Sequence, residues 1–250
     1  MSITMLVLLV LAGVAAGFLN TLAGGGTLIA LPVLLLVGLP ADIANATSRL
    51  GVLVQSIAGA HGFGAEGKVD RRVATWIVVP TVFGGLLGAM IASRVPASVM
   101  KPILIVTLFG IAVMLMARPQ TVAADSGSVS IDPRTRPFAL VLLFGAGIYG
   151  GFLQASMGII LLSLLGGLLQ FDLIRANALK SIAIGALTFA ALLVFVIERK
   201  VAWLPGIALS IGTAVGAKLA VRFAIAKGQR VVMRVVLLAV LGSGLAVLFK

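Results

Sequence analysis

Cysteine is absent from the 250 residues of the chain, and histidine and acidic residues number only one and seven. Without cysteine the protein has no disulfides, no thiolate metal site and no cysteine nucleophile. One histidine and so few carboxylates leave little material for metal binding or general-base chemistry. We therefore expect no metal, no cofactor and no enzymatic activity.

Charge is also scarce. Only 10% of the residues are charged and 61% are hydrophobic, and the mean hydropathy is +1.23. An ordinary soluble domain is about 25% charged and under half apolar. Several apolar runs reach about 20 residues, which is long enough to cross a hydrocarbon core of about 30 Å. The composition predicts an all-α integral membrane protein.

The charge that is present is mostly positive, with a net value of +12. Most basic residues fall in short loops between apolar segments, where they orient the chain and meet anionic headgroups, so we expect the lipid bilayer and no nucleic acid as partner. The more basic side should be cytoplasmic, which places both termini on the periplasmic or extracellular side. The predicted cytoplasmic side collects Lys68, Arg71, Arg72, Arg118, Arg134, Arg136, Arg175, Arg222, Lys227 and Arg230, and the opposite side collects Arg94, Lys101, Arg199, Lys200 and Lys250.

The sequence contains ten apolar segments, two of which, at 26–38 and 158–170, span only about 13 residues. A helix of that length covers roughly 20 Å and is too short to cross the membrane alone. These two segments either cross as parts of broken helices or are re-entrant, so we expect about eight to ten membrane segments. The others lie at 2–19, 43–63, 73–93, 98–117, 137–153, 174–197, 202–224 and 230–249.

The two sides of a polar linker at 118–136 resemble each other. Residues 1–117 are predicted as a first membrane repeat and 137–250 as a second, because motifs recurring in the same order are typical of a duplicated unit. Each repeat holds five segments, an odd number, so the second should be inverted relative to the first, as in many secondary transporters. The matches are GFLNTLAG from Gly17 with GFLQASMG from Gly151, ANATSR from Ala44 with ANALKS from Ala176, and Gly84 and Gly88 with Gly212 and Gly216.

A first candidate site is the region 20–32, where three glycines interrupt an apolar run. Irregular backbone at membrane depth is tolerated where it lines a cavity, and free amides at a helix N-terminus favour an anion. The alternative is tight helix packing, since small residues let membrane helices approach closely. Paired interruptions in the two halves favour a binding site. The residues predicted to bind substrate are Asn20, Gly24, Gly25, Gly26, Thr27, Gln154 and Ser156.

A second candidate is a pair of basic residues inside apolar segments. Arg49 lies about six residues, or roughly 9 Å, into its segment, and Lys180 lies similarly deep in the second half. A cation at membrane depth costs at least about 2.5 kcal/mol and by default suggests a function. The alternative is that each long side chain snorkels to the interface. With their neighbours, the residues predicted to bind substrate here are Asn45, Ser48, Arg49, Asn177, Lys180 and Ser181.

Carboxylates are missing from the predicted membrane depth. Asp42 and Asp172 precede segments and are predicted as helix N-caps, and the other acids fall in loops or at a helix end. A cationic substrate therefore has no counter-ion, whereas an anionic one has two. His61, near the end of a segment, is predicted either to couple transport to protons or to be an interfacial polar residue.

Together these motifs resemble those of the TauE/SafE family of sulfite exporters, also called the TSUP family. The resemblance implies export of a small sulfur-containing anion, such as sulfite or a sulfonate, across a bacterial-type cell inner membrane by a multi-pass protein. The second half departs from the family pattern, because SMGIILLSLL stands where another glycine-rich break with a proline is expected. The motifs are GFLNTLAGGGTLIALP, ADIANATSRL, GKVD and GGLLGAMIASRVP, then GGFLQASMG, DLIRANALK and GTAVGAKLAVR.

With this resemblance, the function expected is alternating-access transport of such an anion between the inverted repeats. A passive anion channel, or a carrier of another small organic anion such as a carboxylate, remains the alternative. The small anionic substrate and the lipid bilayer are the expected partners. The sequence leaves the oligomeric state undetermined, and a homodimer is one alternative.

Overall fold

The computed structural model describes residues 1–22, 24–66, 70–117 and 130–248, with side chains described up to residue 226 except at 65–69 and 112–117. Within these ranges all regular structure is helical, which confirms the predicted all-α fold. The helices are α1 (Ile3–Leu22), α2 (Thr27–Leu36), α3 (Ala41–Glu66), α4 (Arg71–Arg94), α5 (Ala97–Ala117), η1 (Pro133–Thr135), α6 (Pro137–Phe152), α7 (Met157–Leu162), the π-helical η2 (Ser163–Leu168), α8 (Leu173–Ile197) and α9 (Trp203–Leu248).

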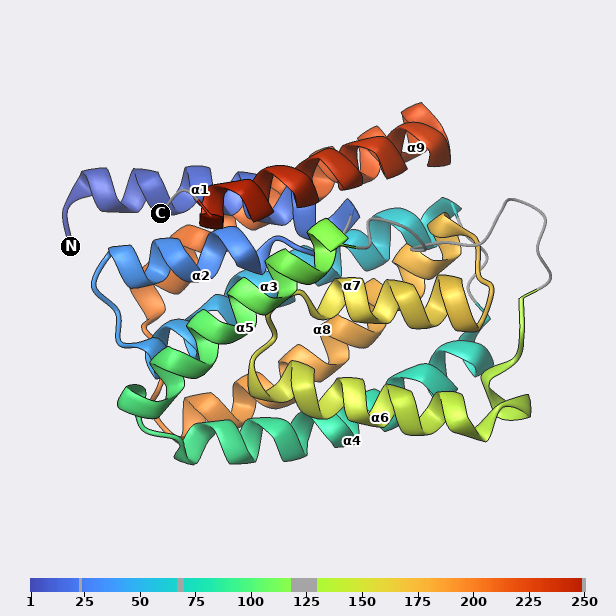
Figure 1. Cartoon of the computed structure of the whole chain (residues 1–250), viewed down its shortest axis with the longest axis horizontal. Coiled ribbons are helices and arrows are strands. Elements are labelled where there is room, and N and C mark those ends of the chain that lie inside the picture. Colours follow the sequence, from blue (N-terminus) through green and yellow to red (C-terminus); the bar gives the residue numbers. More distant parts are fainter. Residues whose placement is uncertain (23, 67–69, 118–129, 249–250) are drawn as a thin grey trace.

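Nearly every predicted segment corresponds to one helix. The short segment 26–38 is α2, and 158–170 is α7 continued by η2, whereas the last two predicted segments fall within the single helical range of α9. Among the described residues, four helices are long and apolar enough to cross a membrane by length and composition: α1, α4, α8 and residues Trp203–Ala226 of α9. The helices form an elongated bundle (Figure 1).

The distribution of polarity is that of a protein surrounded by lipid. Large apolar side chains lie on the outside, for example Phe83, Val106 and Ile197, which are 64%, 70% and 78% exposed. The polar residues Arg49 and Lys180 are instead buried. Because soluble proteins rarely expose large contiguous apolar patches, this arrangement supports insertion in a membrane.

The two predicted aspartate caps have different outcomes. The Asp172 carboxylate accepts hydrogen bonds from the backbone N–H groups of Ile174 and Arg175, which confirms it as the N-cap of α8. The prediction for Asp42 is wrong, because the Pro40 carbonyl already accepts the first helical bond of α3 and Asp42 lies within the first turn. Its carboxylate instead pairs with Lys200 at 3.0 Å.

The first helix of each half packs along a helix of the other half. α1 lies along α9, and α6 lies along α4. Glycines make these contacts close: a Cβ atom at Gly147 of α6 would collide with the Thr81 carbonyl, and one at Gly13 of α1 would collide with the Leu209 carbonyl. These two contacts involve positions that correspond under the offsets of the sequence repeat.

The same correspondence holds for the glycines of α4 and α9. A Cβ atom at Gly84 or Gly88 would meet the carbonyls of Phe144 and Ile148 in α6. A Cβ atom at the matching glycines of α9 would meet the equivalent carbonyls of α1. Gly212 faces the Val10 carbonyl, and Gly216 faces the Val14 carbonyl.

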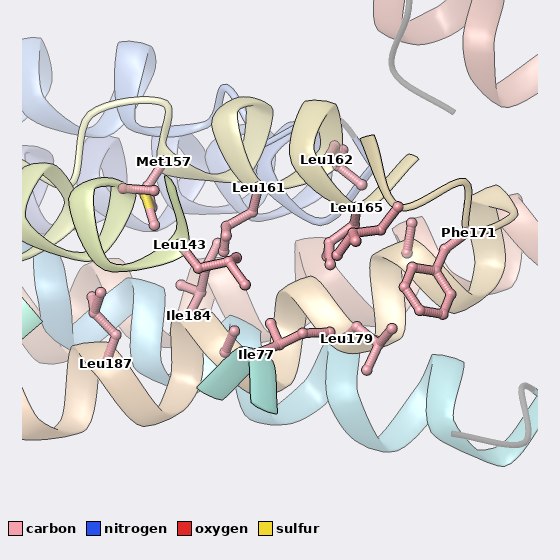
Figure 2. Close-up of a cluster of buried hydrophobic side chains, with 14 of the residues drawn as sticks. Ile77, Leu143, Met157, Leu161, Leu162, Leu165, Phe171, Leu179, Ile184 and Leu187 are labelled. Atoms are coloured by element: carbon pink, nitrogen blue, oxygen red, sulfur yellow. The ribbon is translucent and has the colours of Figure 1, made fainter. Parts of the chain in front are cut away.

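A large apolar core fills the space between α4, α6, α7, η2 and α8. Figure 2 shows Ile77, Leu143, Leu161, Leu179 and Leu187 converging there, all of them buried. α8 lies inside the bundle and contacts both α3 and α4. Its central place is why polar residues on this helix face the interior of the protein and not lipid.

Two neighbouring glycines of α6 offer a test of the close helix contacts. A Cβ atom at Gly147 collides with the Thr81 backbone, whereas one at Gly145 meets nothing within 4 Å. We expect Gly147→Ala to lose about 1–3 kcal/mol of stability through overpacking. Gly145→Ala should be neutral or stabilising by up to about 1 kcal/mol, since alanine favours the helix. Melting temperatures of the purified proteins in detergent measure both, and equal values would contradict this packing.

Candidate functional site

The broken regions of the two halves meet inside the bundle. Gly24 has φ +85°, and a Cβ atom there would collide with the backbone of Gly158, just as one at Gly158 would collide with Gly24. These glycines close the motifs GFLNTLAG and GFLQASMG and are equivalent positions of the repeat. The Ser156 N–H also donates to the Thr27 hydroxyl at 2.7 Å. The two breaks are thus in direct contact.

Arg49 of α3 binds the end of α6. Its guanidinium donates through Nη1 to the Gly150 carbonyl (3.2 Å) and through Nη2 to the carbonyls of Gly151 (2.6 Å) and Phe152 (3.4 Å). Nη1 also donates to the Gln154 side-chain oxygen at 2.7 Å. The guanidinium thereby satisfies carbonyl groups that the helix itself leaves without donors at its C-terminus.

Other groups fix the guanidinium of Arg49. It lies 4.7 Å from the centre of the Phe195 ring, within the range of a cation–π contact. Asn45, one turn earlier on α3, donates to the Phe152 carbonyl at 2.8 Å. Within the described part of the chain, Arg49 Nε and Asn45 Oδ1 are buried without hydrogen-bond partners.

Lys180 of α8 binds the end of α1 in the corresponding way. Its ammonium group donates to the carbonyls of Asn20 (3.2 Å) and Thr21 (2.8 Å) and to the Asn177 side-chain oxygen (2.6 Å). Asn177 also donates from its amide nitrogen to the Leu173 carbonyl at 3.0 Å. All three protons of the ammonium group are therefore directed at oxygen atoms of the protein.

Each basic residue thus neutralises the negative end of a broken helix from the other half. A positive charge near a helix C-terminus is favourable because the carbonyl ends carry a partial negative charge. Arg49 is 0% and Lys180 2% exposed. Both side chains point at backbone groups inside the bundle, which is not the snorkelling arrangement.

The second break holds two residues in the left-handed region of backbone space. Gln154 has φ 60° and Ser156 has φ 54°, a conformation that costs non-glycine residues about 1–3 kcal/mol. Gln154 is held there by Arg49 and by donating to the Thr188 hydroxyl at 2.8 Å. Strain of this kind is maintained where surrounding contacts determine the position of the side chain.

The glycines of the first break differ in what they do. Gly26 is required for packing, because a Cβ atom there would collide with the Ala16 carbonyl, and its N–H donates to the Asn20 side chain at 3.3 Å. Gly25 has room for a side chain. Gly24 and Gly26 thus allow close packing of the backbone, and their role in substrate binding stays a prediction.

Two predicted residues lie outside this cluster of contacts. Ser48 is buried, but its hydroxyl donates to the Asn45 carbonyl of its own helix at 2.9 Å. His61 lies exposed on α3. The role of His61 in coupling transport to protons stays a prediction. Lys68, one of the basic loop residues, lies outside the described residues.

A small polar cavity lies beside Lys180, with a volume of about 10 Å³, enough for one water-sized particle. Sequence reasoning found three of its polar residues and missed Thr21, Gln55 and Ser56. The repeat could have indicated Ser56, because it matches Thr188 under the offset that relates the two asparagines. The cavity is lined by Asn20, Thr21, Gln55, Ser56, Lys180, Ser181 and Ile184.

Other cavities have different linings. One of about 270 Å³ between α5, α6 and α7 is mainly apolar, and Ser156 lines it with a hydroxyl that lacks a hydrogen-bond partner. Another, of about 170 Å³, includes Asp70, Asp132 and Arg175. In the described ranges no group of three or more His, Cys, Asp or Glu residues is placed to hold a metal ion.

Comparison with known proteins identifies a family and several relatives of this sequence. The sequence profile described as "Sulfite exporter TauE/SafE" matches residues 9–247. The chain is 28% identical over 230 residues to the probable membrane transporter protein ORF9 of Sinorhizobium sp, covering 91% of this chain and 86% of that protein. It is also 28% identical over 232 residues to the probable membrane transporter protein YfcA of Escherichia coli K12, covering 92% and 85%.

A third relative is a probable membrane transporter protein of Haemophilus influenzae, 24% identical over 242 residues and covering 94% of this chain and 91% of that protein. No solved structure matches the chain. The profile match spans both broken helices and both buried cations. This chain belongs to the TauE/SafE family of membrane transporters.

Proposed function

We propose that this protein is a secondary transporter that exports a small sulfur-containing anion, such as sulfite or a sulfonate, by alternating access between two inverted halves. The proposal rests mainly on one observation. Two buried basic residues, Arg49 and Lys180, each bind the carbonyl end of a broken helix from the opposite half, next to the point where the breaks cross. Discontinuous helices of this kind form the substrate sites of many secondary transporters.

The sign of the substrate follows from the charges of the interior. The buried polar set consists of amides, hydroxyls and the two cations. The described carboxylates lie elsewhere, at helix ends or in loops. They are Asp42, Asp70, Asp132, Asp172 and Glu198. A buried positive charge that faces no carboxylate is stabilised by an anion, whereas a second cation there would be repelled.

The arrangement of the helices supports the division into 1–117, the linker 118–136, and 137–250. In Figure 1, α1 starts at the left end of the bundle, whereas its counterpart α6 starts at the right end. Equivalent glycines make equivalent contacts, and the equivalent residues Gly24 and Gly158 touch each other. A contact between equivalent positions is expected where a two-fold axis relates two halves.

A mechanism follows from the contacts of the two cations. In this structure their protons are directed at helix-end carbonyls, so an arriving anion competes with those carbonyls for the same donors. Binding would loosen the tie between one half and the broken helix of the other, which allows the halves to move relative to one another. The sulfur substrate and the outward direction come from the family's description, and the membrane is a bacterial-type inner membrane.

Transport in proteoliposomes tests the proposed function. We expect saturable uptake of labelled sulfite that is accelerated by unlabelled sulfite on the other side, because a carrier exchanges substrate and a channel does not. A panel of sulfonates, carboxylates and cations as competitors, with and without proton and sodium gradients, defines the substrate and the coupling ion. Flux that never saturates would favour the channel, and competition only by carboxylates would favour a carboxylate carrier.

Replacement of either cation tests the site. Arg49→Gln and Lys180→Gln should each lower transport about 10- to 150-fold, because a hydrogen bond to a charged group contributes about 1.5–3 kcal/mol. Lys101→Gln is the control, since Lys101 is an exposed cation of α5. Initial rates are normalised to folded protein in the vesicles. Wild-type rates in both variants would show that these cations take no part in transport.

Accessibility of single cysteines tests the inverted arrangement. The chain contains no cysteine, so Arg71→Cys and Arg199→Cys can be labelled without removing native thiols. These exposed residues precede or begin the equivalent helices α4 and α9. An impermeant reagent added to whole cells should label Arg199→Cys, and Arg71→Cys only after lysis. Labelling of both from one side would contradict the two inverted halves.

A further inference from the structure

The two cation sites are related by the repeat but differ in their surroundings: a cavity with polar walls lies beside Lys180, whereas the Gln154 side chain bridges Arg49 and Thr188. We propose that the transported oxyanion binds at the Lys180 site, where Thr21, Gln55, Ser56 and Ser181 donate hydrogen bonds to it. In the Arg49 site, Gln154 fills the corresponding place. This inference rests on the proposed function and specifies where the substrate binds.

The Arg49 site is closed by its own side chains. Gln154 accepts from Arg49 at 2.7 Å and donates to Thr188 at 2.8 Å, so both ends of its amide are engaged. The nearby positions Val52 and Ala155 are apolar and buried. Leu187, the counterpart of Gln55, is also apolar and buried. The Gln154 amide therefore occupies the place between Arg49 and Thr188.

The Lys180 site differs at the positions of Gln154, Thr188, Ala155 and Leu187, whereas Val52 and its counterpart Ile184 are both apolar. Asn20, the counterpart of Gln154, is one methylene shorter, and its side-chain oxygen accepts from the Gly26 N–H. No hydrogen bond between the side chains of Asn20 and Ser56, the counterpart of Thr188, is found in the described part of the chain. Gln55 stands in place of Leu187, and Thr21 in place of Ala155. The result is a cavity with polar walls where the other site has a filled contact.

The side chains around this cavity are polar and mostly buried. Thr21, Gln55, Ser56 and Ser181 are 4%, 4%, 5% and 4% exposed. All four line the cavity together with the Lys180 side chain. Polar walls beside a cation favour an anionic occupant that accepts hydrogen bonds over an apolar one, because buried polar groups require hydrogen-bond partners.

The chemistry of the walls defines the ligand. Two amides and three hydroxyls can donate hydrogen bonds, Lys180 contributes a positive charge, and no carboxylate is among the residues that line the cavity. Six of the seven lining residues are polar or charged, and Ile184 is the exception, so an alkyl substituent would displace hydrogen-bonded groups. We therefore infer that the ligand is a compact inorganic oxyanion of the sulfite class and not an alkyl sulfonate.

The cavity has to expand to admit such an anion, since it now holds about one water-sized particle. The longest of the three Lys180 bonds, at 3.2 Å to the Asn20 carbonyl, is the one that can be exchanged for the anion at least cost. Gln55 has three rotatable side-chain bonds and can swing without moving its helix. Binding would thus begin by loosening the contact between Lys180 and α1.

The test compares equivalent positions in the two sites. Ser56→Ala and Gln55→Leu, which copies Leu187, should each raise the KM for sulfite about 10-fold or more, because each removes a hydrogen bond to a charged ligand. Both should leave the melting temperature without sulfite unchanged or higher. They should also reduce the rise in melting temperature that sulfite produces in the wild-type protein. Thr188→Val, the matched control, should lower the melting temperature without sulfite but keep the wild-type KM and sulfite-induced rise.

The outcomes separate this inference from the proposed function. Wild-type transport of sulfite combined with an unchanged KM in Ser56→Ala and Gln55→Leu would overturn the Lys180 site and leave the transporter assignment intact. A raised KM in Thr188→Val alone would place the ligand at Arg49. Tighter binding of alkyl sulfonates than of sulfite would overturn the inorganic class. If no oxyanion of the panel is transported or shifts the melting temperature, both the function and the site are wrong.

Discussion

The last carbonyl groups of α1 and α6 depend on donors that their own helices cannot supply. Both helices stop inside the bundle, and groups left unbonded at membrane depth cost several kcal/mol each. Lys180 and Arg49 provide the missing donors from the opposite half. The broken helices, the buried cations and the crossing of the two halves are therefore parts of one arrangement of contacts.

Helix contacts built on glycine bring these groups within reach. The carbonyls of α6 approach Gly84 and Gly88 of α4 so closely that no side chain fits between them, and α1 approaches α9 in the same way. In lipid, association of this kind depends on close packing, because apolar side chains gain nothing by leaving lipid for each other. The glycines thus set the spacing at which an arginine or a lysine on the next helix reaches the helix ends.

Much of this could be predicted from the sequence, and the reason lies in the repeat. Gly17 with Gly151 and Asn45 with Asn177 indicate the repeat and lead to both buried cations, and apolar run lengths identify all but one boundary between segments. The partners of the cations could not be predicted, because Arg49 bonds to backbone carbonyls and any residue supplies those. The place of Gln55 in the candidate site could not be predicted either, because its counterpart in the repeat, Leu187, is apolar.

The contact between Arg49 and α6 has a consequence for how the protein is made. The atoms that Arg49 binds lie 101 to 105 residues further along the chain. When the first five helices leave the ribosome, the guanidinium has none of these partners, and a charge without partners at membrane depth disfavours insertion. The buried position of Arg49 is therefore completed only by the second half of the chain, since its hydrogen-bond partners belong to α6 and the break that follows it. A first half made alone would have to accommodate this guanidinium in another way, although it has enough helices to resemble an independent unit.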